Sequence, residues 1–390
     1  MKHWRVIVIV LTALAAVPVT FVEAAVAAPS PGVVASGFCT YRTGYLATST
    51  QAAERINTYF VAGAVGSEIF HVGDPATYAY TWRKTGTLVP VGKGKNTVQV
   101  DSGVAALRQA IGSAGQPGAF STSAANPTNM GTGGILGAQA LAEKVNQGFS
   151  EVFVTPATGF SGLSFVDMEG MELDGVPLTP EQAAALNGQA TLQVREAADA
   201  ALGGGPLPYG LSFAQLTSLI DLVNGSFESC APSGFAQAHI YQPYVTSSAF
   251  LGRRPSTVST FASKPTYNTF SGDVVPVSPD ADGRRLGCTG DSYTTFPAGK
   301  IALIERGVCT FYQKVAVANA AGASAAIIFN SAPAAGCPTV PMPGANNCEA
   351  LVGMGAAAGL PPLPIPAAFV QRSTGVALRD GTAVTAFVQQ

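Results

Sequence analysis

The fold of the C-terminal third of this 390-residue chain is decided by one stretch, Gly299-Lys-Ile-Ala-Leu-Ile-Glu-Arg-Gly-Val-Cys-Thr-Phe-Tyr-Gln-Lys-Val-Ala-Val-Ala-Asn-Ala-Ala-Gly-Ala-Ser-Ala-Ala-Ile-Ile-Phe-Asn330. Its segment Ile301–Ile304 is apolar on both faces, as in a strand buried within a parallel sheet. Ala325–Phe329 is a second run of the same kind. A segment long enough for a helix separates the two runs, so the stretch predicts a β-α-β unit with a right-handed crossover.

The segment between the two runs carries helix signals at both ends. Thr310 is a good N-cap residue, and Gln313 lies three residues later, where it would complete a capping box. Gly322 is expected to end the helix in a left-handed conformation. The apolar stripe that would lie on the sheet consists of Phe311, Val315 and Ala318.

This stretch resembles the signature of the protease-associated (PA) domain, a G-K-I-A-L-x-x-R-G-x-C-x-F strand and turn before a helix that ends in A-G-A. Ser271–Val275 is similar to the lead-in of that family, and Pro364–Val370 to its closing strand. The motif positions here are Gly299, Lys300, Arg306, Gly307, Cys309, Phe311, Lys314 and Gly322.

The resemblance implies a compact β-rich domain containing the β-α-β unit and flanking helices, without catalytic residues of its own. It also implies a domain that is appended to exported peptidases and binds a protein or peptide there. We interpret Glu305, Arg306 and Lys314 as ordinary charges of a strand end and a helix face; contact with a ligand is the alternative.

The N-terminus predicts export. Residues 1–28 combine a charged start, an apolar run and the small residues Ala24–Ala28, which is the layout of a secretory signal peptide. An uncleaved membrane anchor is the alternative. No later segment offers about 20 uninterrupted apolar residues, so we expect no membrane span after cleavage. The mature protein is expected to be secreted or periplasmic.

Composition and length suggest a folded protein of two domains. Hydrophobic residues make up 47% of the chain and charged residues 11%, which is compatible with a buried core. The formal net charge of −2, without a basic stripe, argues against a nucleic-acid partner. We expect an α+β or mixed α/β fold with an α/β module of unknown function at 29–245, a linker at 246–261 that is rich in Ser, Thr and Pro, and the PA domain at 262–390.

Two helices of the N-terminal module are recognisable. Thr179-Pro-Glu-Gln182 predicts a capping box with Pro at the first helical position, and its helix is expected to continue towards Leu202 with an interruption at Gly188. Ser212-Phe-Ala-Gln215 predicts a second capping box, with Gly225 just past the end of the helix. The segments Cys39–Tyr45, Gly134–Asn146 and Ala198–Gly203 are weakly similar to modules of exported bacterial proteins, and this similarity implies no activity.

The six cysteines all follow the signal peptide, and an even number in an exported protein predicts disulfides. We expect the pairs Cys39–Cys230, Cys288–Cys309 and Cys337–Cys348. The first would tie together the two ends of the N-terminal module, and the other two close short loops. Metal binding is the alternative, but no C-x-x-C spacing occurs.

Catalytic motifs are not recognisable. Beyond the leader the chain has only His71 and His239, and no H-E-x-x-H or G-x-S-x-G motif. Four carboxylates within Asp167–Asp174 could bind calcium, but a solvated turn is the simpler interpretation. We therefore expect no catalytic site, no metal and no cofactor.

The sequence thus favours a secreted, non-catalytic protein that recognises a protein or peptide partner. One alternative is an exported, peptidase-like hydrolase with an unrecognised catalytic N-terminal domain. It would be favoured by a pocket in which His71 or His239 lies beside a serine or a carboxylate. The other alternative is an adhesive or structural surface protein, which a large exposed apolar patch on residues 29–245 would support.

Overall fold

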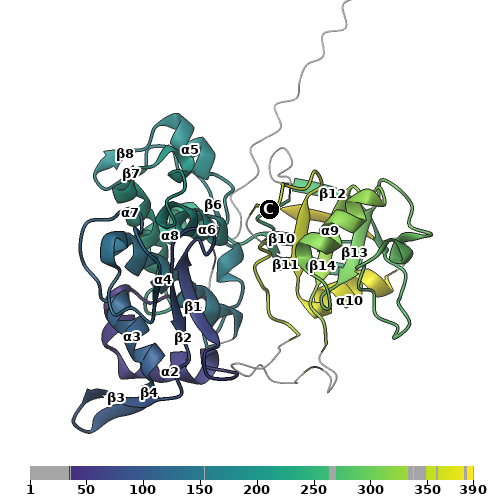
Figure 1. Cartoon of the computed structure of the whole chain (residues 1–390). Helices are drawn as coiled ribbons and strands as arrows, with labels where there is room; N and C mark the ends of the chain where they lie inside the picture. The colour runs from purple at the N-terminus through teal and green to yellow at the C-terminus, as the bar shows by residue number, and fades with distance from the viewer. Residues whose placement is uncertain are drawn as a thin grey trace, which may run out of the picture. The chain divides into compact units, whose positions relative to one another are not determined.

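The computed structural model describes residues 35, 37–152, 154–262, 269–332, 337, 348–356, 359–381 and 384–389. The expected signal peptide, residues 1–28, lies outside the described residues. The fold is mixed α/β, as expected: ten α-helices are described, and the C-terminal part forms a closed β-barrel (Figure 1). Among the described residues, no helix combines the length and the apolar character that crossing a membrane requires.

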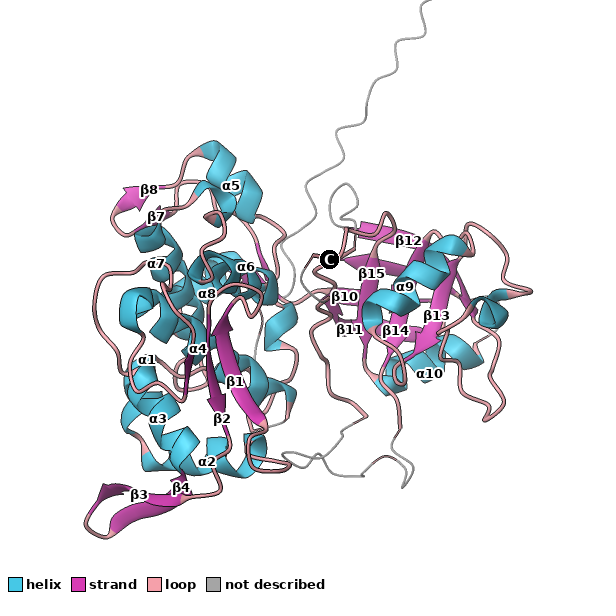
Figure 2. Cartoon of the chain, in the orientation of Figure 1, coloured by secondary structure: helices cyan, strands magenta, loops and turns pink. Residues whose placement is uncertain are grey.

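The N-terminal half is mainly helical, and its strands are short (Figure 2). Its helices are α1 (Thr43–Thr48), α2 (Thr50–Phe60), α3 (Ser102–Ile111), α4 (Gly134–Glu151), α5 (Pro180–Leu186), α6 (Thr191–Leu202), α7 (Phe213–Asn224) and α8 (Gly234–His239). Its strands are β1 (Glu68–Gly73), β2 (Ala79–Arg83), β3 (Leu88–Lys93), β4 (Asn96–Asp101), β5 (Ala124–Ala125), β6 (Ser164–Phe165), β7 (Glu172–Leu173), β8 (Val176–Pro177) and β9 (Ile240–Tyr241).

Helix α4 forms the centre of this half, where it packs against α3, α6, α7 and β1. Most of its residues are buried, including the polar residues Glu143, Asn146 and Gln147. The Asn146 amide donates to Asn224 Oδ1 at 2.9 Å and accepts from the Tyr41 amide at 2.9 Å. These bonds join α4 to α7 and to the segment just before α1. They also satisfy the buried amide of Asn146, which would be costly to bury without partners.

The buried side chain of Glu143 has fewer hydrogen bonds than that of Asn146. Its Oε1 accepts a hydrogen bond from Gln147 at 3.1 Å, while Oε2 is buried without a partner among the described residues. Loss of hydration raises the pKa of Glu143 to about 8, and the positive charge of Arg195 acts in the opposite direction. This carboxyl group is therefore mostly protonated at neutral pH.

The two expected capping boxes are present, at Thr179 before α5 and at Ser212 before α7. The helical segment expected from Thr179 to Leu202, with an interruption at Gly188, is two separate helices, α5 and α6. Gly188, with φ of +77°, lies in the break between them. A left-handed residue cannot continue an α-helix, so the chain turns here before α6 begins.

The barrel is closed by seven strands in the order β10-β11-β15-β14-β13-β12-β16. Strands β12 to β15 run parallel to one another, and the remaining neighbours pair antiparallel. The elements are β10 (Tyr244–Ser247), β11 (Phe250–Val258), β12 (Thr269–Pro276), β13 (Ile301–Glu305), α9 (Phe311–Ala320), β14 (Ala325–Phe329), β15 (Ala367–Val370), α10 (Arg372–Asp380) and β16 (Thr385–Gln389).

The expected β-α-β unit is β13-α9-β14, and every residue of both strands is buried. The Thr310 hydroxyl accepts from the Gln313 amide at 3.1 Å, and Gly322 adopts φ of +82°, as expected. The reciprocal half of the capping box is not formed. The Gln313 side chain instead donates to the Cys288 carbonyl oxygen at 3.1 Å, an acceptor that the sequence pattern did not reveal.

Residues 246–261, expected as a linker, differ from that expectation. Most of them lie in β10 and β11, which pair with each other and with β16 and β15 of the barrel. The first part of β11 is exposed and carries Arg253 and Arg254, while Ser256 to Val258 are buried. The polar composition that suggested a linker is therefore that of a strand with one solvated end.

The three disulfides join the expected pairs, Cys39–Cys230, Cys288–Cys309 and Cys337–Cys348. The first closes a sequence separation of 191 residues and ties the start of the N-terminal half to its end. Cross-links of this kind are typical of proteins that fold in oxidising compartments.

We predict that Gly375→Ala destabilises the barrel by about 1–3 kcal/mol, which thermal unfolding would detect. A Cβ atom at Gly375 in α10 would lie 2.1 Å from Cβ of Phe329 in β14, so one of the two elements must shift. The control is Gly234→Ala in α8, where an added Cβ meets nothing within 4 Å. Equal melting temperatures for both variants would contradict this packing.

We also predict that Glu143→Gln becomes more stable relative to the wild type as the pH rises from about 4.5 to about 8. The folded protein retains a proton on Glu143 that the unfolded chain has lost in this window, so the wild type loses stability with rising pH. Urea unfolding at several pH values measures the difference. Glu54→Gln, at an exposed position, serves as the control. If the difference in the free energy of unfolding between Glu143→Gln and the wild type did not change with pH, the raised pKa of Glu143 would be refuted.

Candidate functional site

The PA-motif residues do not gather at one place, because they lie at both ends of β13 and along α9. At the start of the strand, the Lys300 ammonium pairs with Asp273 at 2.6 Å, and the Gly299 amide donates to the Gly322 carbonyl. Cys309 is cross-linked to Cys288, and Phe311 packs edge-on against Phe369. Most of the motif therefore serves the fold of the barrel.

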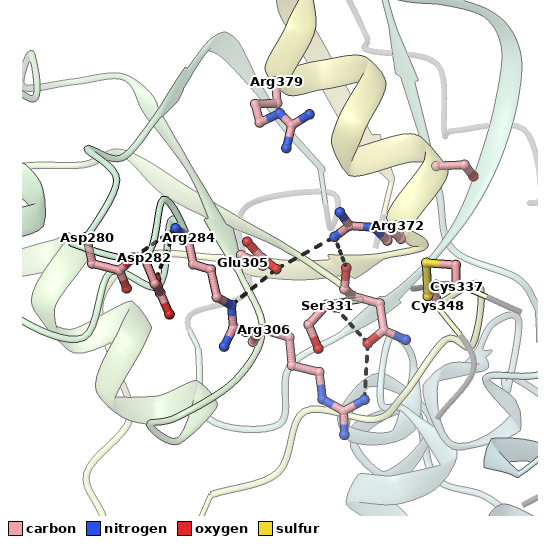
Figure 3. A network of polar contacts seen from close by, with 12 residues as sticks. Asp280, Asp282, Arg284, Glu305, Arg306, Ser331, Cys337, Cys348, Arg372 and Arg379 are labelled. Atoms are coloured by element: carbon pink, nitrogen blue, oxygen red, sulfur yellow. Dashed lines mark hydrogen bonds and ion pairs between the residues drawn. A yellow bond between two sulfur atoms is a disulfide. The ribbon is translucent and has the colours of Figure 1, made fainter. Parts of the chain in front are cut away.

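At the opposite end of β13 the motif enters a polar network (Figure 3). Glu305 is nearly buried, and its Oε1 lies 3.6 Å from both Arg284 and Arg372. Arg306 donates to Asn330 Oδ1 at 3.2 Å. Gly307 follows with φ of +123°, and a Cβ there would lie 2.6 Å from a guanidinium nitrogen of Arg284. The positive φ and the close approach of Arg284 together favour glycine at position 307.

Lys314 is fully buried, which corrects its interpretation as an ordinary charge on a helix face. Its ammonium donates to the Leu286 carbonyl oxygen and lies 3.7 Å from Cys288 Sγ. Loss of hydration lowers the pKa of Lys314 to about 8. Arg306 and Glu305 are also more enclosed than the sequence suggested.

A cavity of about 980 Å³ is lined mainly by residues of the N-terminal half, together with Gly353, Gly355 and Ala356, and it brings several titratable groups together. Its volume is that of a site for a small molecule or a peptide side chain. The polar side chains that line it are Glu68, His71, Asp74, Lys144, Gln147, Glu151, Arg195, Glu196 and Asp199, and the apolar ones include Phe60, Ile69, Phe70 and Leu192.

His71 and Glu68 form a close pair at this cavity. Residues three apart on a regular strand point to opposite faces, but the register of β1 against β2 shifts between Glu68 and Phe70. Such a bulge adds one residue and brings Glu68 and His71 to the same side. His71 Nδ1 lies 2.6 Å from Glu68 Oε1, and its side chain is 33% exposed.

Asp199 organises the positive charges beside this pair. It accepts from Arg195 at 2.6 Å, from Lys144 at 3.0 Å and from the Gly73 amide at 3.0 Å. Lys144 also donates to the His71 carbonyl oxygen. The two cations are only about a tenth exposed. Burial lowers the pKa of Lys144, and the charge of Asp199 acts against this shift.

Two further carboxyl groups line the cavity. Loss of hydration raises the pKa of Glu196, with the charge of Arg195 acting in the opposite direction. It also raises the pKa of Glu151, whose Oε1 accepts from the Ser161 hydroxyl at 3.1 Å. The cavity therefore combines an imidazole oriented by a carboxylate, two buried cations and two carboxyl groups that retain protons more readily than usual.

The remaining sequence candidates lie elsewhere. His239 is not among the residues that line this cavity; its Nδ1 contacts the Val166 carbonyl oxygen at 3.2 Å. The carboxylates of Asp167, Glu169, Glu172 and Asp174 are exposed, with the last two at the β7–β8 hairpin. Of the described residues, no three or more His, Cys, Asp or Glu side chains are grouped so as to bind a metal ion.

The sequence did not reveal the cavity, because the charged residues that line it come from three segments that lie far apart along the chain. Glu68 and His71 lie on β1, Lys144 on α4, and Arg195 and Asp199 on α6. The one local signal was a helical spacing of four residues between Arg195 and Asp199. The pairing of Glu68 with His71 depends on the bulge in β1, which the sequence does not predict.

Curated relatives match short parts of the chain. An aminopeptidase of Pseudomonas aeruginosa is 57% identical over 44 residues, which are 11% of this chain and 8% of the relative. A probable leucine aminopeptidase 2 of Aspergillus fumigatus is 42% identical over 66 residues, 17% of this chain and 13% of the relative. The chain thus spans only about a tenth of the length of the relatives that it matches.

A solved structure with local similarity is the zinc aminopeptidase BSAP from Bacillus subtilis, at 21% identity and a TM-score of 0.28. The match covers 38% of this chain and 29% of that one. So low a TM-score adds no argument about the fold or the function.

The comparison with curated relatives corrects two expectations. A non-catalytic binding protein, and hence no enzyme, was expected, but the relatives that share sequence with this chain are aminopeptidases. The alternative of an exported hydrolase fits them better.

The resemblance to the PA domain is confirmed, because residues 270–378 match the model of the PA domain family. The chain therefore carries a PA domain in its C-terminal part.

Proposed function

We propose that this protein is an exported hydrolase that cleaves peptides, with its active site in the cavity beside β1. The observation that carries the proposal is the contact of 2.6 Å between His71 and Glu68 within a cavity that also holds buried cations. The relatives that are aminopeptidases support the choice of peptide bonds as the substrate class.

In this proposal the nucleophile is water. None of the residues found to line the cavity is a serine, threonine or cysteine. Glu68 accepts the Nδ1 proton of His71 and fixes the ring tautomer, which leaves Nε2 free to accept a proton from a water molecule. The water then attacks the carbonyl carbon of the peptide bond.

The other groups supply charge stabilisation and a proton. Arg195 and Lys144 are held by Asp199, so they can stabilise the oxyanion of the tetrahedral intermediate without first being reoriented. Glu196, with its raised pKa, is the candidate to donate a proton to the departing amine.

Zinc does not fit the described residues as a resident metal. BSAP is a zinc aminopeptidase. In the described part of this chain, no group of three or more His, Cys, Asp or Glu side chains is arranged as zinc ligands, and a catalytic zinc site needs about three. We therefore derive no step through a metal ion.

We further propose a secreted or periplasmic location, in keeping with the three disulfides. In this proposal the peptide that the PA domain is expected to bind is the substrate of the hydrolase or a part of that substrate. Our proposed boundaries remain an N-terminal module from residue 29 and a PA domain to residue 390, with β10 and β11 counted in the barrel.

We predict that His71→Gln reduces kcat for peptide hydrolysis by about 10²–10⁴-fold with a smaller change in KM, because it removes the general base. Glu68→Gln is expected to reduce kcat less, since the imidazole remains but loses the partner that orients it. The measurement is cleavage of a mixed peptide library by purified, disulfide-bonded protein, followed by mass spectrometry and then by kinetics on one cleaved peptide.

His239→Gln is the matched control, since His239 is not among the lining residues, and it should leave kcat unchanged. Circular dichroism must show that all three variants are folded. The proposal would be refuted if His71→Gln cleaved the peptide with the kcat of the wild type. It would also be refuted if the wild type cleaved none of the library peptides.

A further inference from the structure

We propose that the carboxyl ends of β13, β14 and β15 form a second site, an oxyanion site that binds the carboxylate of a peptide. It does not depend on the cavity beside β1. Arg306 follows β13, Asn330 follows β14, and Arg372 begins α10 soon after β15. In parallel sheets, ligands bind outside the carboxyl ends of the strands, where loop residues converge.

Three guanidinium groups lie at this end of the sheet, and two of them share one carboxylate. Arg284 and Arg372 both approach Oε1 of Glu305 at 3.6 Å (Figure 3). These separations exceed the 2.7–2.9 Å of a charge-assisted hydrogen bond, so Glu305 does not engage either guanidinium in a bidentate pair. Arg306 has no carboxylate within 4 Å among the described residues, and it donates instead to the neutral Asn330 amide oxygen.

The donor capacity of the arginines is far from exhausted. Each guanidinium carries five N–H donors. Arg284 also donates to the Arg306 carbonyl oxygen at 3.0 Å, and Arg372 donates to the Asn330 carbonyl oxygen at 3.5 Å. Arg284 and Arg372 are 33% and 22% exposed, so a ligand can reach them.

The other charges nearby are already engaged or more distant. Asp280 and Asp282 accept from the backbone amide of Arg284, and Glu349 caps the start of α10 through Ser373. Arg379 is paired with Asp380. Glu151 acts on the pKa of Arg306 by its charge but forms no ion pair with it within 4 Å.

The three guanidiniums have only Glu305 as a shared carboxylate, so the group carries a net positive charge of two, and Arg306 has no carboxylate within 4 Å among the described residues. A half-buried cation without a counter-ion is costly, and a bound oxyanion would remove that cost. The planar fork of a guanidinium matches a carboxylate in a bidentate pair, which favours a peptide carboxylate as the ligand.

The test measures binding by calorimetry at low ionic strength, with the complete disulfide-bonded protein. The probes are acetylated dialanine with a free C-terminal carboxylate, the same peptide as its amide, and inorganic phosphate. We expect the free acid to bind and the amide not to bind. Binding should weaken as salt is added.

Arg372→Gln and Arg306→Gln should each weaken binding of the acid about tenfold or more, whereas Arg379→Gln, with its own partner Asp380, should not. Glu305→Gln should strengthen it severalfold, because the internal carboxylate that competes for the same guanidiniums is removed. This increase in affinity would not follow from damage to the fold. His71→Gln should bind as the wild type does, which separates this site from the proposed active site.

Equal affinity for the acid and the amide, or no binding of the acid, would overturn the proposal. Binding of phosphate without binding of the acid would contradict the choice of a carboxylate ligand. Weaker binding in Glu305→Gln, with its circular dichroism unchanged, would refute the competition on which the argument depends.

Discussion

The arrangement of the N-terminal half depends on the carboxylate of Asp199. It accepts from Arg195 on its own helix, from Lys144 on the central helix α4 and from the Gly73 amide at the end of β1. One buried anion therefore ties together three of the elements that line the cavity and keeps two cations in place. Without it, Lys144 would lose its carboxylate partner and Arg195 would retain only the more distant Glu196, at 3.7 Å, and removing one partner of a buried ion pair is strongly destabilising.

The barrel shows a related arrangement in a different part of the chain. Four parallel strands end at one edge, and the residues that follow three of them are charged or polar. Strands β13, β14 and β15 are apolar apart from Glu305 at the end of β13, so the polar groups here lie at or beyond the carboxyl ends of these strands. Glu305 is the single internal anion among three arginines there, which is why its removal is expected to change ligand affinity rather than only stability.

Local features could be predicted from the sequence, and most long-range ones could not. The β-α-β unit and the caps at Thr179 and Ser212 follow from short patterns of apolar and capping residues. The disulfide pairs could also be predicted, and one of them, Cys39–Cys230, is long-range, with a sequence separation of 191 residues. The strand character of 246–261 was hidden because β11 is exposed over its first half. The pairing of His71 with Glu68 requires a bulge, and the contacts of Asp199 with Lys144 and Gly73 join residues more than 50 positions apart, so neither is visible in a linear pattern.

The most direct test of the central claim, that peptides are hydrolysed in the cavity beside β1, is a crystal structure of His71→Gln with a bound peptide that the wild type cleaves. The account predicts that the scissile carbonyl lies in this cavity, with its oxygen within hydrogen-bonding distance of Arg195 or Lys144. A peptide bound elsewhere, with this cavity free of peptide, would contradict the account.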